Sequence, residues 1–172
     1  RDGAKFEDQT LAAEPWAYEM QALGFNYRLP DVLCALGISQ LAKLERFTVQ
    51  RRRLAARYCE LLAPLAPHVQ LQPLPPGCDP ALHLFIVLID FGAAGRSRRE
   101  VMAALKARGI GTQVHYIPVH RQPYYARRYG QTVLPGADAY YRRCLSLPLF
   151  PGMADGDMDR VVEALGDVVG IP

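Results

Sequence analysis

Two short segments carry most of the side chains that could do chemistry. The first is GFNYR, in which Asn26 and Arg28 come just before an apolar-periodic helical run. Backbone N–H groups at the start of a helix are free to donate, and the helix dipole favours an anion there. An amide and a guanidinium in this place would suit a phosphate group. The alternative is that Asn26 shapes a turn, Tyr27 packs, and Arg28 pairs with a surface acid.

The second segment is HYIPVHRQPYY, which holds His115 and His120 among aromatic residues and prolines. A histidine near a strand end can contact a substrate. Beside Tyr124 and Tyr125 it can equally be a hydrogen-bonded structural group. The local residues leave both interpretations open.

Sequence patterns for several other chemistries are missing. No serine stands in a nucleophile elbow, and no HExxH occurs. Asp155, Asp157 and Asp159 lack the glycine and terminal glutamate of a calcium loop. The cysteines have neither CxxC spacing nor nearby histidine ligands, so we predict no zinc site, no other metal site and no disulfide framework. These cysteines are Cys34, Cys59, Cys78 and Cys144.

Composition indicates a soluble globular protein. Half of the 172 residues are hydrophobic and 22% are charged, and no apolar run approaches the roughly 20 residues of a membrane span. The net charge is +3, and the densest basic cluster, residues 51–53, lies in a helical pattern that also contains Glu45 and Glu60. That cluster favours a solvated helix face over nucleic-acid binding. We expect no membrane or nucleic-acid partner and a cytoplasmic location, in a chain whose start at Arg1 looks like a cut.

Hydrophobic periodicity predicts the elements that must position these residues. Pro30 begins a long helix that ends at the prolines at 64 and 67, with a kink near Phe47 to Val49. Residues 82–90 read as a strand buried on both faces. Further along we predict an exposed connector at 71–82, a capped helix between Ser97 and Gly109, strands at 109–120 and within 145–153, and helices at 122–129, 136–144 and 157–169. The fold class is α/β, a small sheet covered by helices.

Three blocks of the sequence resemble consecutive blocks of the DegT/DnrJ/StrS family of pyridoxal-phosphate-dependent sugar aminotransferases. They are MQALGFNYRLPDVLCALGISQLAKLERF, RGIGTQVHYIPVHRQPYY and SLPLFPGM followed by DGDMDRVVEAL, in the family's order and spacing. The resemblance implies a fold-type I homodimer of which this chain is the C-terminal part. Residues 1–29 would then be the tail of the large cofactor-binding domain, 30–66 a long connecting helix, and 67–172 the small C-terminal α/β domain.

The resemblance also implies roles for particular residues. Asn26 matches an asparagine that reaches across the dimer interface to the phosphate of the partner's pyridoxal 5'-phosphate, and Arg28 would be a second cofactor contact. Tyr27 would contact the nucleotide or the cofactor. Substrate contacts are also implied for the residues that match the strand and loop facing the sugar nucleotide, which are His115, Tyr116 and His120.

No residue of the chain matches a catalytic residue of the family. The lysine that forms the Schiff base and the aspartate that pairs with the pyridine nitrogen lie upstream of the matched region in these enzymes. Lys5, Lys43 and Lys106 stand in no matching context. Since amino transfer needs the cofactor as its electron sink, we expect the isolated chain to be inactive.

The implied activity is transfer of an amino group from glutamate to the 4-keto group of a UDP-linked deoxy sugar, in surface-polysaccharide or pseudaminic acid synthesis. A relative acting on another nucleotide sugar, such as a dTDP-sugar, or a dehydratase with histidine in place of the lysine, is an alternative enzyme. A free-standing, non-catalytic dimerisation or binding module is an alternative of another class. A trimmed fragment would expose apolar surface where the missing domain packed.

Overall fold

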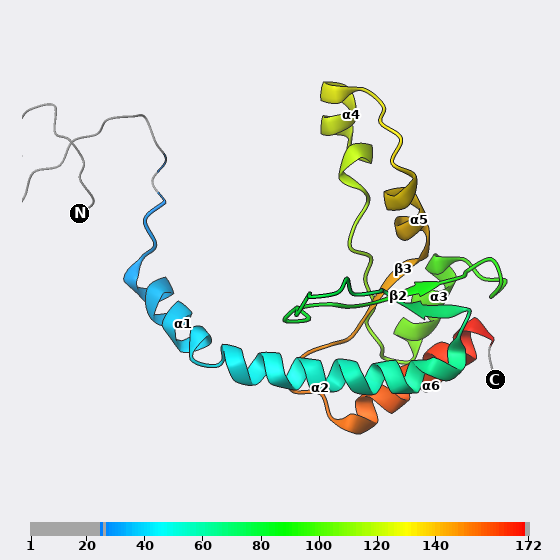
Figure 1. Ribbon diagram of the computed structural model, residues 1–172, viewed down its shortest axis with the longest axis horizontal. Coiled ribbons are helices and arrows are strands. Elements are labelled where there is room, and N and C mark those ends of the chain that lie inside the picture. The colour runs from blue at the N-terminus through cyan, green and yellow to red at the C-terminus, as the bar shows by residue number, and fades with distance from the viewer. Residues whose placement is uncertain (1–24, 26, 171–172) are drawn as a thin grey trace, which may run out of the picture. The chain divides into compact units, whose positions relative to one another are not determined.

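The computed structural model describes Phe25 and residues 27–170 (Figure 1). The chain divides into two compact units, Arg1–Leu41 and Ala42–Pro172. In the first unit the described residues lead into helix α1 (Asp31–Leu41). The Pro30 carbonyl accepts hydrogen bonds from the N–H groups of Leu33 and Cys34, at 2.9 and 3.1 Å. The helix therefore starts where the proline predicts, although none of its residues is buried.

The single helix expected over 30–66 is two helices. After α1, residues Ala42 and Lys43 form a turn, and α2 (Leu44–Leu62) follows in the second unit. Alanine and lysine are both strong helix formers, so local propensity does not account for this turn. The segment from Phe47 to Val49, where a kink is predicted, lies inside α2, and the helical region is interrupted before it, at Ala42 and Lys43. The β-branched side chains of Thr48 and Val49 cost a helix only about a few tenths of a kcal/mol, too little to interrupt it.

A three-stranded antiparallel sheet forms the centre of the second unit. Its strands are β1 (Val69–Leu71), β2 (Phe85–Ile89) and β3 (Cys144–Leu147), in the order β1-β2-β3. The strands predicted at 82–90 and within 145–153 are confirmed by β2 and β3. Strand β1 was not predicted, because three residues are too few for alternation to show. It follows the 3₁₀ helix η1 (Ala63–Leu65), which ends the helical region near the predicted prolines.

The strand predicted over 109–120 is wrong. In that segment only Gln113 pairs with the sheet, as an isolated bridge to Ser146. The chain enters through Gly109, which has a φ of +75°, and Gly111 follows two residues later. Glycine weakens a strand, and Pro118 further along has no N–H to donate. The segment therefore touches the sheet edge once and then leaves it.

The remaining α-helices follow the predicted pattern, whereas the short 3₁₀ helix η2 (Val119–Arg121) was not predicted and overlaps the end of the segment predicted as a strand over 109–120. The α-helices are α3 (Arg98–Ala107), α4 (Pro123–Tyr129), α5 (Pro135–Arg143) and α6 (Asp155–Val169). Helix α3 has the predicted capping box, in which Ser97 and Glu100 bond reciprocally. Helix α6 begins two residues earlier than predicted, at an acidic first turn.

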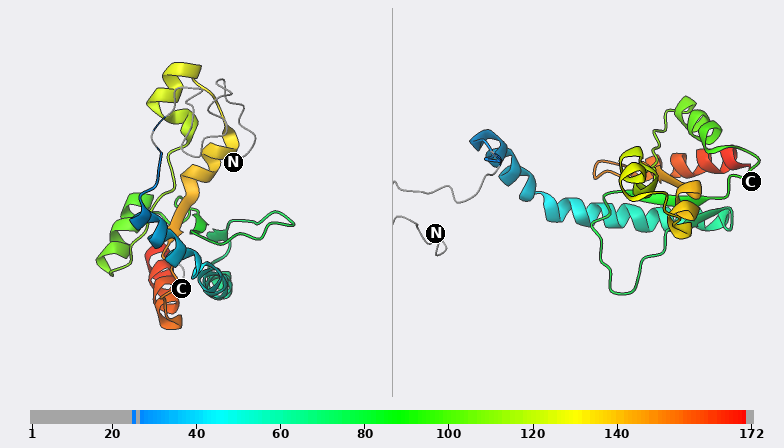
Figure 2. Two further views of the ribbon diagram at one scale, coloured as in Figure 1. Left: turned by 90° about the vertical axis from the view of Figure 1, so that its left-hand side faces the viewer. Right: turned by 90° about the horizontal axis from the view of Figure 1, so that it is seen from above.

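The hydrophobic core lies between one face of the sheet and three helices. Helices α2 and α6 run side by side (Figures 1 and 2), and α3 packs against α6. On β2, Phe85, Val87 and Ile89 face this core, whereas Ile86 and Leu88 on the other face are half-buried. The strand was predicted to be buried on both faces. In the structure one face of β2 is buried and the other is half-buried. The core also contains Leu54, Tyr58 and Leu62 of α2, Val101 and Leu105 of α3, and Met158, Val161 and Leu165 of α6.

Candidate functional site

The residues predicted to hold a phosphate belong to the first unit. Asn26 lies outside the described residues. Tyr27 is 84% exposed, and its ring stacks on Phe25 with 5.4 Å between the centroids. Arg28 is exposed, and within the described part of the chain its side chain makes no hydrogen bond or ion pair. The alternative of a surface ion pair for Arg28 thus has no partner among those residues.

His115 is placed in the second unit by strand β3. Its Nδ1 atom lies 2.8 Å from the Oγ atom of Ser146. The backbone next to it is fixed as well, because Gln113 and Ser146 exchange two hydrogen bonds, with N···O distances of 3.3 and 2.8 Å. The imidazole is half-buried, so one nitrogen is bound to the protein while the ring still reaches the surface.

Tyr116 lies beside this histidine. The two rings meet edge to face with centroids 4.7 Å apart, and Tyr116 is 71% exposed. An exposed aromatic ring next to an anchored imidazole offers a flat surface and a polar group together. That combination suits a sugar or nucleotide base, so the geometry is compatible with the predicted substrate contacts.

His120 is held in a different way. It lies on η2, its side chain is only 11% exposed, and its Nε2 atom is 3.4 Å from Oδ1 of Asp138 on α5. The same oxygen is 2.7 Å from Nη2 of Arg121, although neither contact has hydrogen-bond geometry. The Arg121 guanidinium lies 6.0 Å from the ring centroid of Tyr141. This cluster ties η2 to α5.

A cavity of about 370 Å³ adjoins the cluster. Its lining includes His120, Arg121 and Asp138, together with Gln131 and Thr132 from the segment between α4 and α5. These side chains could bind a polar ligand. His115 and Tyr116 do not line this cavity, so the structure places the two predicted histidines in separate surroundings.

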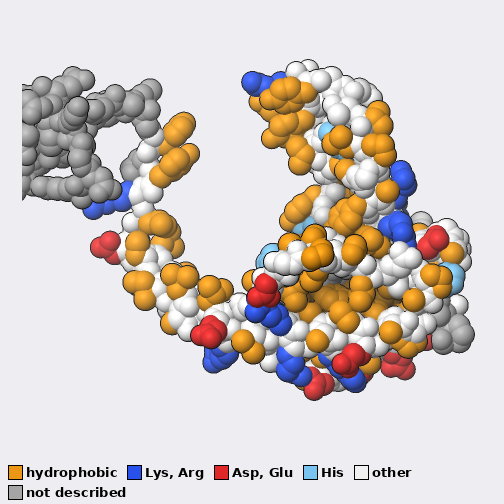
Figure 3. All heavy atoms as spheres, in the orientation of Figure 1, with side chains coloured by type: hydrophobic (Ala, Val, Ile, Leu, Met, Phe, Trp, Pro, Cys, Tyr) orange, Lys and Arg blue, Asp and Glu red, His pale blue; other side chains and the backbone are white. Residues whose placement is uncertain are grey.

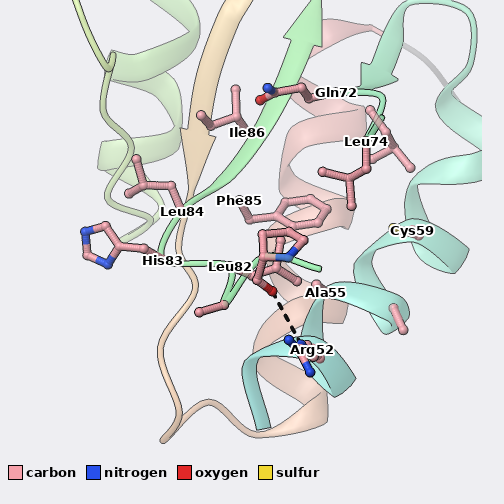
Figure 4. A pocket seen from close by; sticks show the side chains of 14 residues that line it. Arg52, Ala55, Cys59, Gln72, Leu74, Leu82, His83, Leu84, Phe85 and Ile86 are labelled. Atoms are coloured by element: carbon pink, nitrogen blue, oxygen red, sulfur yellow. Dashed lines mark hydrogen bonds between the residues drawn. The ribbon is translucent and has the colours of Figure 1, made fainter. Parts of the chain in front are cut away.

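A larger cavity in the second unit, of about 590 Å³, contains none of the predicted site residues (Figure 4). It lies between α2 and the connector that follows β1. Arg52 crosses its edge, where Nε donates to the Pro80 carbonyl at 3.4 Å. Its walls are mainly apolar. The titratable residues that line it are Arg52, Cys59 and His83. Burial raises the pKa of the Cys59 thiol, which keeps the thiol neutral at pH 7.

Two partners in these clusters were not singled out in the sequence. Ser146 is the one buried polar residue of the described region. A single serine inside the apolar run CLSLPL was the signal that could have found it. Asp138 carried no comparable signal, because an acid in the first turn of a helix is common.

Two structural features bear on metal ions and membranes. Over Phe25 and residues 27–170, no three histidine, cysteine, aspartate or glutamate side chains group so that they could hold a metal ion. Within the same residues, no helix has both the length and the apolar composition needed to cross a membrane.

Comparisons with known proteins point to one family. The model of the DegT/DnrJ/EryC1/StrS aminotransferase family matches residues 4–166. The spore coat polysaccharide biosynthesis protein SpsC of Bacillus subtilis (strain 168) is 38% identical over an alignment of 165 residues that covers 90% of this chain and 40% of that protein.

Solved structures give the same picture. DesV of S. venezuelae, in complex with a ketimine intermediate, is 35% identical with a TM-score of 0.77, covering 88% of this chain and 40% of its own. The aminotransferase TlmJ of Streptoalloteichus hindustanus is 28% identical with a TM-score of 0.77, covering 90% and 40%. Helicobacter pylori PseC, described as an aminotransferase involved in the biosynthesis of pseudoaminic acid, has a TM-score of 0.79 at 24% identity, over 91% and 42%, and it shares the fold.

These matches confirm the predicted α/β fold of part of a fold-type I aminotransferase. The chain spans about 40% of the length of the relatives it matches. The family consists of sugar aminotransferases that use pyridoxal phosphate. With the match running over residues 4–166, the chain belongs to the DegT/DnrJ/EryC1/StrS aminotransferase family.

Proposed function

We propose that this chain is the C-terminal part of an aminotransferase that moves an amino group from glutamate to the 4-keto group of a UDP-linked deoxy sugar. The observation that carries the proposal is the 38% identity to a polysaccharide biosynthesis protein over 90% of the chain. The relative's name supports surface-polysaccharide synthesis. The finer assignment is the step to UDP-4-amino-4,6-dideoxy-N-acetyl-β-L-altrosamine in pseudaminic acid synthesis, which rests on sequence resemblance and is compatible with the fold of PseC.

In this proposal the chain supplies binding groups and no covalent catalyst. Asn26 and Arg28 hold the phosphate of the cofactor bound by the partner subunit of a homodimer. The donor set fits, because an amide and a guanidinium are groups that hold a phosphate, and Arg28 has no other partner among the described residues. Pyridoxal phosphate, when bound, supplies the electron sink that amino transfer requires.

Most of the proposed substrate contacts come from the second unit. Tyr116 and the anchored imidazole of His115 form one polar and aromatic surface, and we assign the sugar nucleotide to it, with His120 as a further contact. Tyr27 of the first unit is proposed separately as a contact to the nucleotide or the cofactor. The lysine that binds the cofactor is supplied from outside these 172 residues, so the isolated chain is inactive. Nucleotide sugars place the reaction in the cytoplasm.

The decisive experiment uses the full-length protein that contains this sequence. It is incubated with pyridoxal phosphate, glutamate and a UDP-linked 4-keto-6-deoxy-N-acetylhexosamine, and products are followed by mass spectrometry. An amino sugar formed together with 2-oxoglutarate supports the proposal, and the 172-residue chain assayed in parallel should form neither. If only a dTDP-linked sugar is turned over, the nucleotide of the substrate is dTDP and not UDP. Loss of a sugar hydroxyl without amination would identify a dehydratase, and binding without turnover would identify a binding module.

The phosphate role has a readout that does not depend on turnover. We expect Asn26→Ala and Arg28→Ala each to weaken cofactor binding by the full-length protein by about tenfold, the loss of one charge-assisted hydrogen bond. Cofactor retention is measured by visible absorbance after dialysis. Arg99→Ala, at an exposed position of α3, is the matched control that removes an arginine elsewhere. Unchanged retention in both phosphate variants would contradict the role.

A further inference from the structure

The inference starts from a serine in an apolar place. Every residue of β3 (Cys144–Leu147) is buried, and Ser146, 5% exposed, is the one buried polar residue in the described part of the chain. A buried hydroxyl without a hydrogen bond costs free energy, so its partner deserves identification. Both backbone groups of Ser146 are already used by Gln113, because the Ser146 N–H donates to the Gln113 carbonyl and the Ser146 carbonyl accepts from the Gln113 N–H. The side-chain hydroxyl is therefore the one group of Ser146 left to form a further hydrogen bond.

The hydroxyl has one hydrogen-bond partner over the described residues, and that partner is Nδ1 of His115 at 2.8 Å. A hydroxyl carries one proton to donate, and a neutral imidazole carries one N–H and one lone pair. If Nδ1–H donated to Oγ, the serine proton would be left in the strand interior without an acceptor. If Oγ–H donates to the Nδ1 lone pair, both groups are satisfied.

We infer that Ser146 is a positioning residue that donates its hydroxyl proton to Nδ1 of His115 and so holds the imidazole in the tautomer with the proton on Nε2. In this state the second ring nitrogen is a hydrogen-bond donor. The lone pair that a general base would need is already occupied by Ser146. Nε2 has no hydrogen-bond partner among the described residues, and the exposed ring of Tyr116 lies next to the imidazole.

An N–H donor beside an exposed aromatic ring suits an acceptor oxygen on a ring-bearing ligand. Resting on the proposed function, that ligand is the nucleotide sugar, and Nε2–H donates to one of its diphosphate, hydroxyl or carbonyl oxygens. His115 therefore binds and orients the substrate and does not remove a proton from it. Two readouts test the two steps separately.

The tautomer is read directly from the 172-residue chain labelled with ¹⁵N-histidine. Long-range ¹H–¹⁵N spectra at a pH where His115 is neutral distinguish a protonated from an unprotonated ring nitrogen. We expect a protonated Nε2 and an unprotonated Nδ1 in the wild type and in Ser146→Thr, which keeps a hydroxyl. In Ser146→Ala the two forms should average. A protonated Nδ1 in the wild type, or a spectrum unaltered by Ser146→Ala, would overturn the inference whatever the protein's activity.

The consequence for substrate is read in the full-length enzyme. Ser146→Ala should raise KM for the nucleotide sugar about three- to tenfold, as expected for one hydrogen bond, and change kcat less than twofold. Ser146→Thr should restore KM. The control is Ser97→Ala, which removes a serine hydroxyl at the start of α3 and should leave KM unchanged. A fall in kcat at constant KM would instead make His115 a proton-transfer group. If no nucleotide sugar is turned over, the proposed function fails while the tautomer result still decides the role of Ser146.

Discussion

At the scale of single residues, Tyr58 connects helix α2 and strand β2 to the segment that follows β3. Its ring is fully buried on α2 and stacks on Phe85 of β2, with 4.7 Å between the centroids. Its hydroxyl donates to the Pro148 carbonyl just after β3, at 3.0 Å. A buried tyrosine needs such a partner, and the partner fixes where the chain leaves the sheet.

We predict that Tyr58→Phe lowers the free energy of unfolding by about 1–2 kcal/mol, because the Pro148 carbonyl loses its donor while the aromatic packing is kept. Urea unfolding of the 172-residue chain measures the change. Tyr140→Phe is the control, since the Tyr140 hydroxyl makes no hydrogen bond within the described residues. An equal loss in both variants would show that the bond to Pro148 contributes nothing specific.

Tyr58 also gives stability a dependence on alkaline pH. Burial raises the pKa of Tyr58, and the negative charge of Asp157 raises it further. The folded state thus keeps the phenol proton after the unfolded chain has begun to lose it, near pH 10. This contribution is complete below that pH and is lost as the pH rises above it. In Tyr58→Phe the decline between pH 9 and 11 should be shallower, and an unchanged slope would contradict the assignment.

At this scale the sequence predicted residue types better than their partners. His115 stood out because histidines are few and its segment is rich in aromatic residues. The hydroxyl that fixes it lies 31 residues away. Tyr58 lies on the buried face of α2, yet its acceptor lies 90 residues further along the chain. Periodicity encodes which side chains turn inward, whereas the partner depends on how strands pair.

At the scale of elements, helix α3 shows what local chemistry can specify. The Ser97 hydroxyl accepts from the Glu100 N–H at 3.3 Å, and the Glu100 carboxylate accepts from the Ser97 N–H at 2.7 Å. Four residues contain the whole motif, so it could be predicted. Strand β1, which was not predicted, instead depends on pairing with β2, outside its own segment. Sequence windows carry no direct information on such contacts.

We predict that Ser97→Ala destabilises the chain by about 1 kcal/mol at pH 7, whereas Ser97→Asp keeps most of the stability because aspartate also caps a helix. Hydrogen bonds from the Ser97 hydroxyl and N–H lower the pKa of Glu100. The carboxylate's contribution is therefore present above the ordinary glutamate pKa and is lost as the pH falls through the lowered one. The difference between wild type and Ser97→Ala should shrink between pH 7 and pH 3 in urea unfolding. A constant difference would mean that the cap acts without Glu100.

At the scale of the whole molecule, the first unit carries apolar surface that nothing in its described part covers. Helix α1 has no buried residue, and Val32 is 79% and Ile38 70% exposed. Figure 3 shows hydrophobic side chains gathered along this helix. A helix that is apolar on its surface needs a partner, because exposed patches of this kind mark contact surfaces. The proposed function supplies one in the remainder of the enzyme or in a second subunit.

We predict that the 172-residue chain, studied alone, self-associates through α1. Val32→Glu combined with Leu36→Glu should shift it toward monomer, because two charges on the apolar surface would have to be desolvated in any complex. Sedimentation velocity at tens of micromolar protein measures the distribution. Ser39→Glu with Gln40→Glu adds the same charge to the same helix at exposed polar positions, and it should leave association largely intact.

The two double variants separate an apolar contact from general charge repulsion. If both abolish association equally, net charge is responsible and α1 is not the contact surface. A wild-type chain that stays monomeric would equally contradict the prediction. In the full-length protein, Val32→Glu with Leu36→Glu should lower stability or weaken the subunit contact, since the same apolar side chains would then be covered. If the same double variant weakens association of the 172-residue chain and the subunit contact of the full-length protein, then α1 forms part of the dimer interface that the proposed reaction requires.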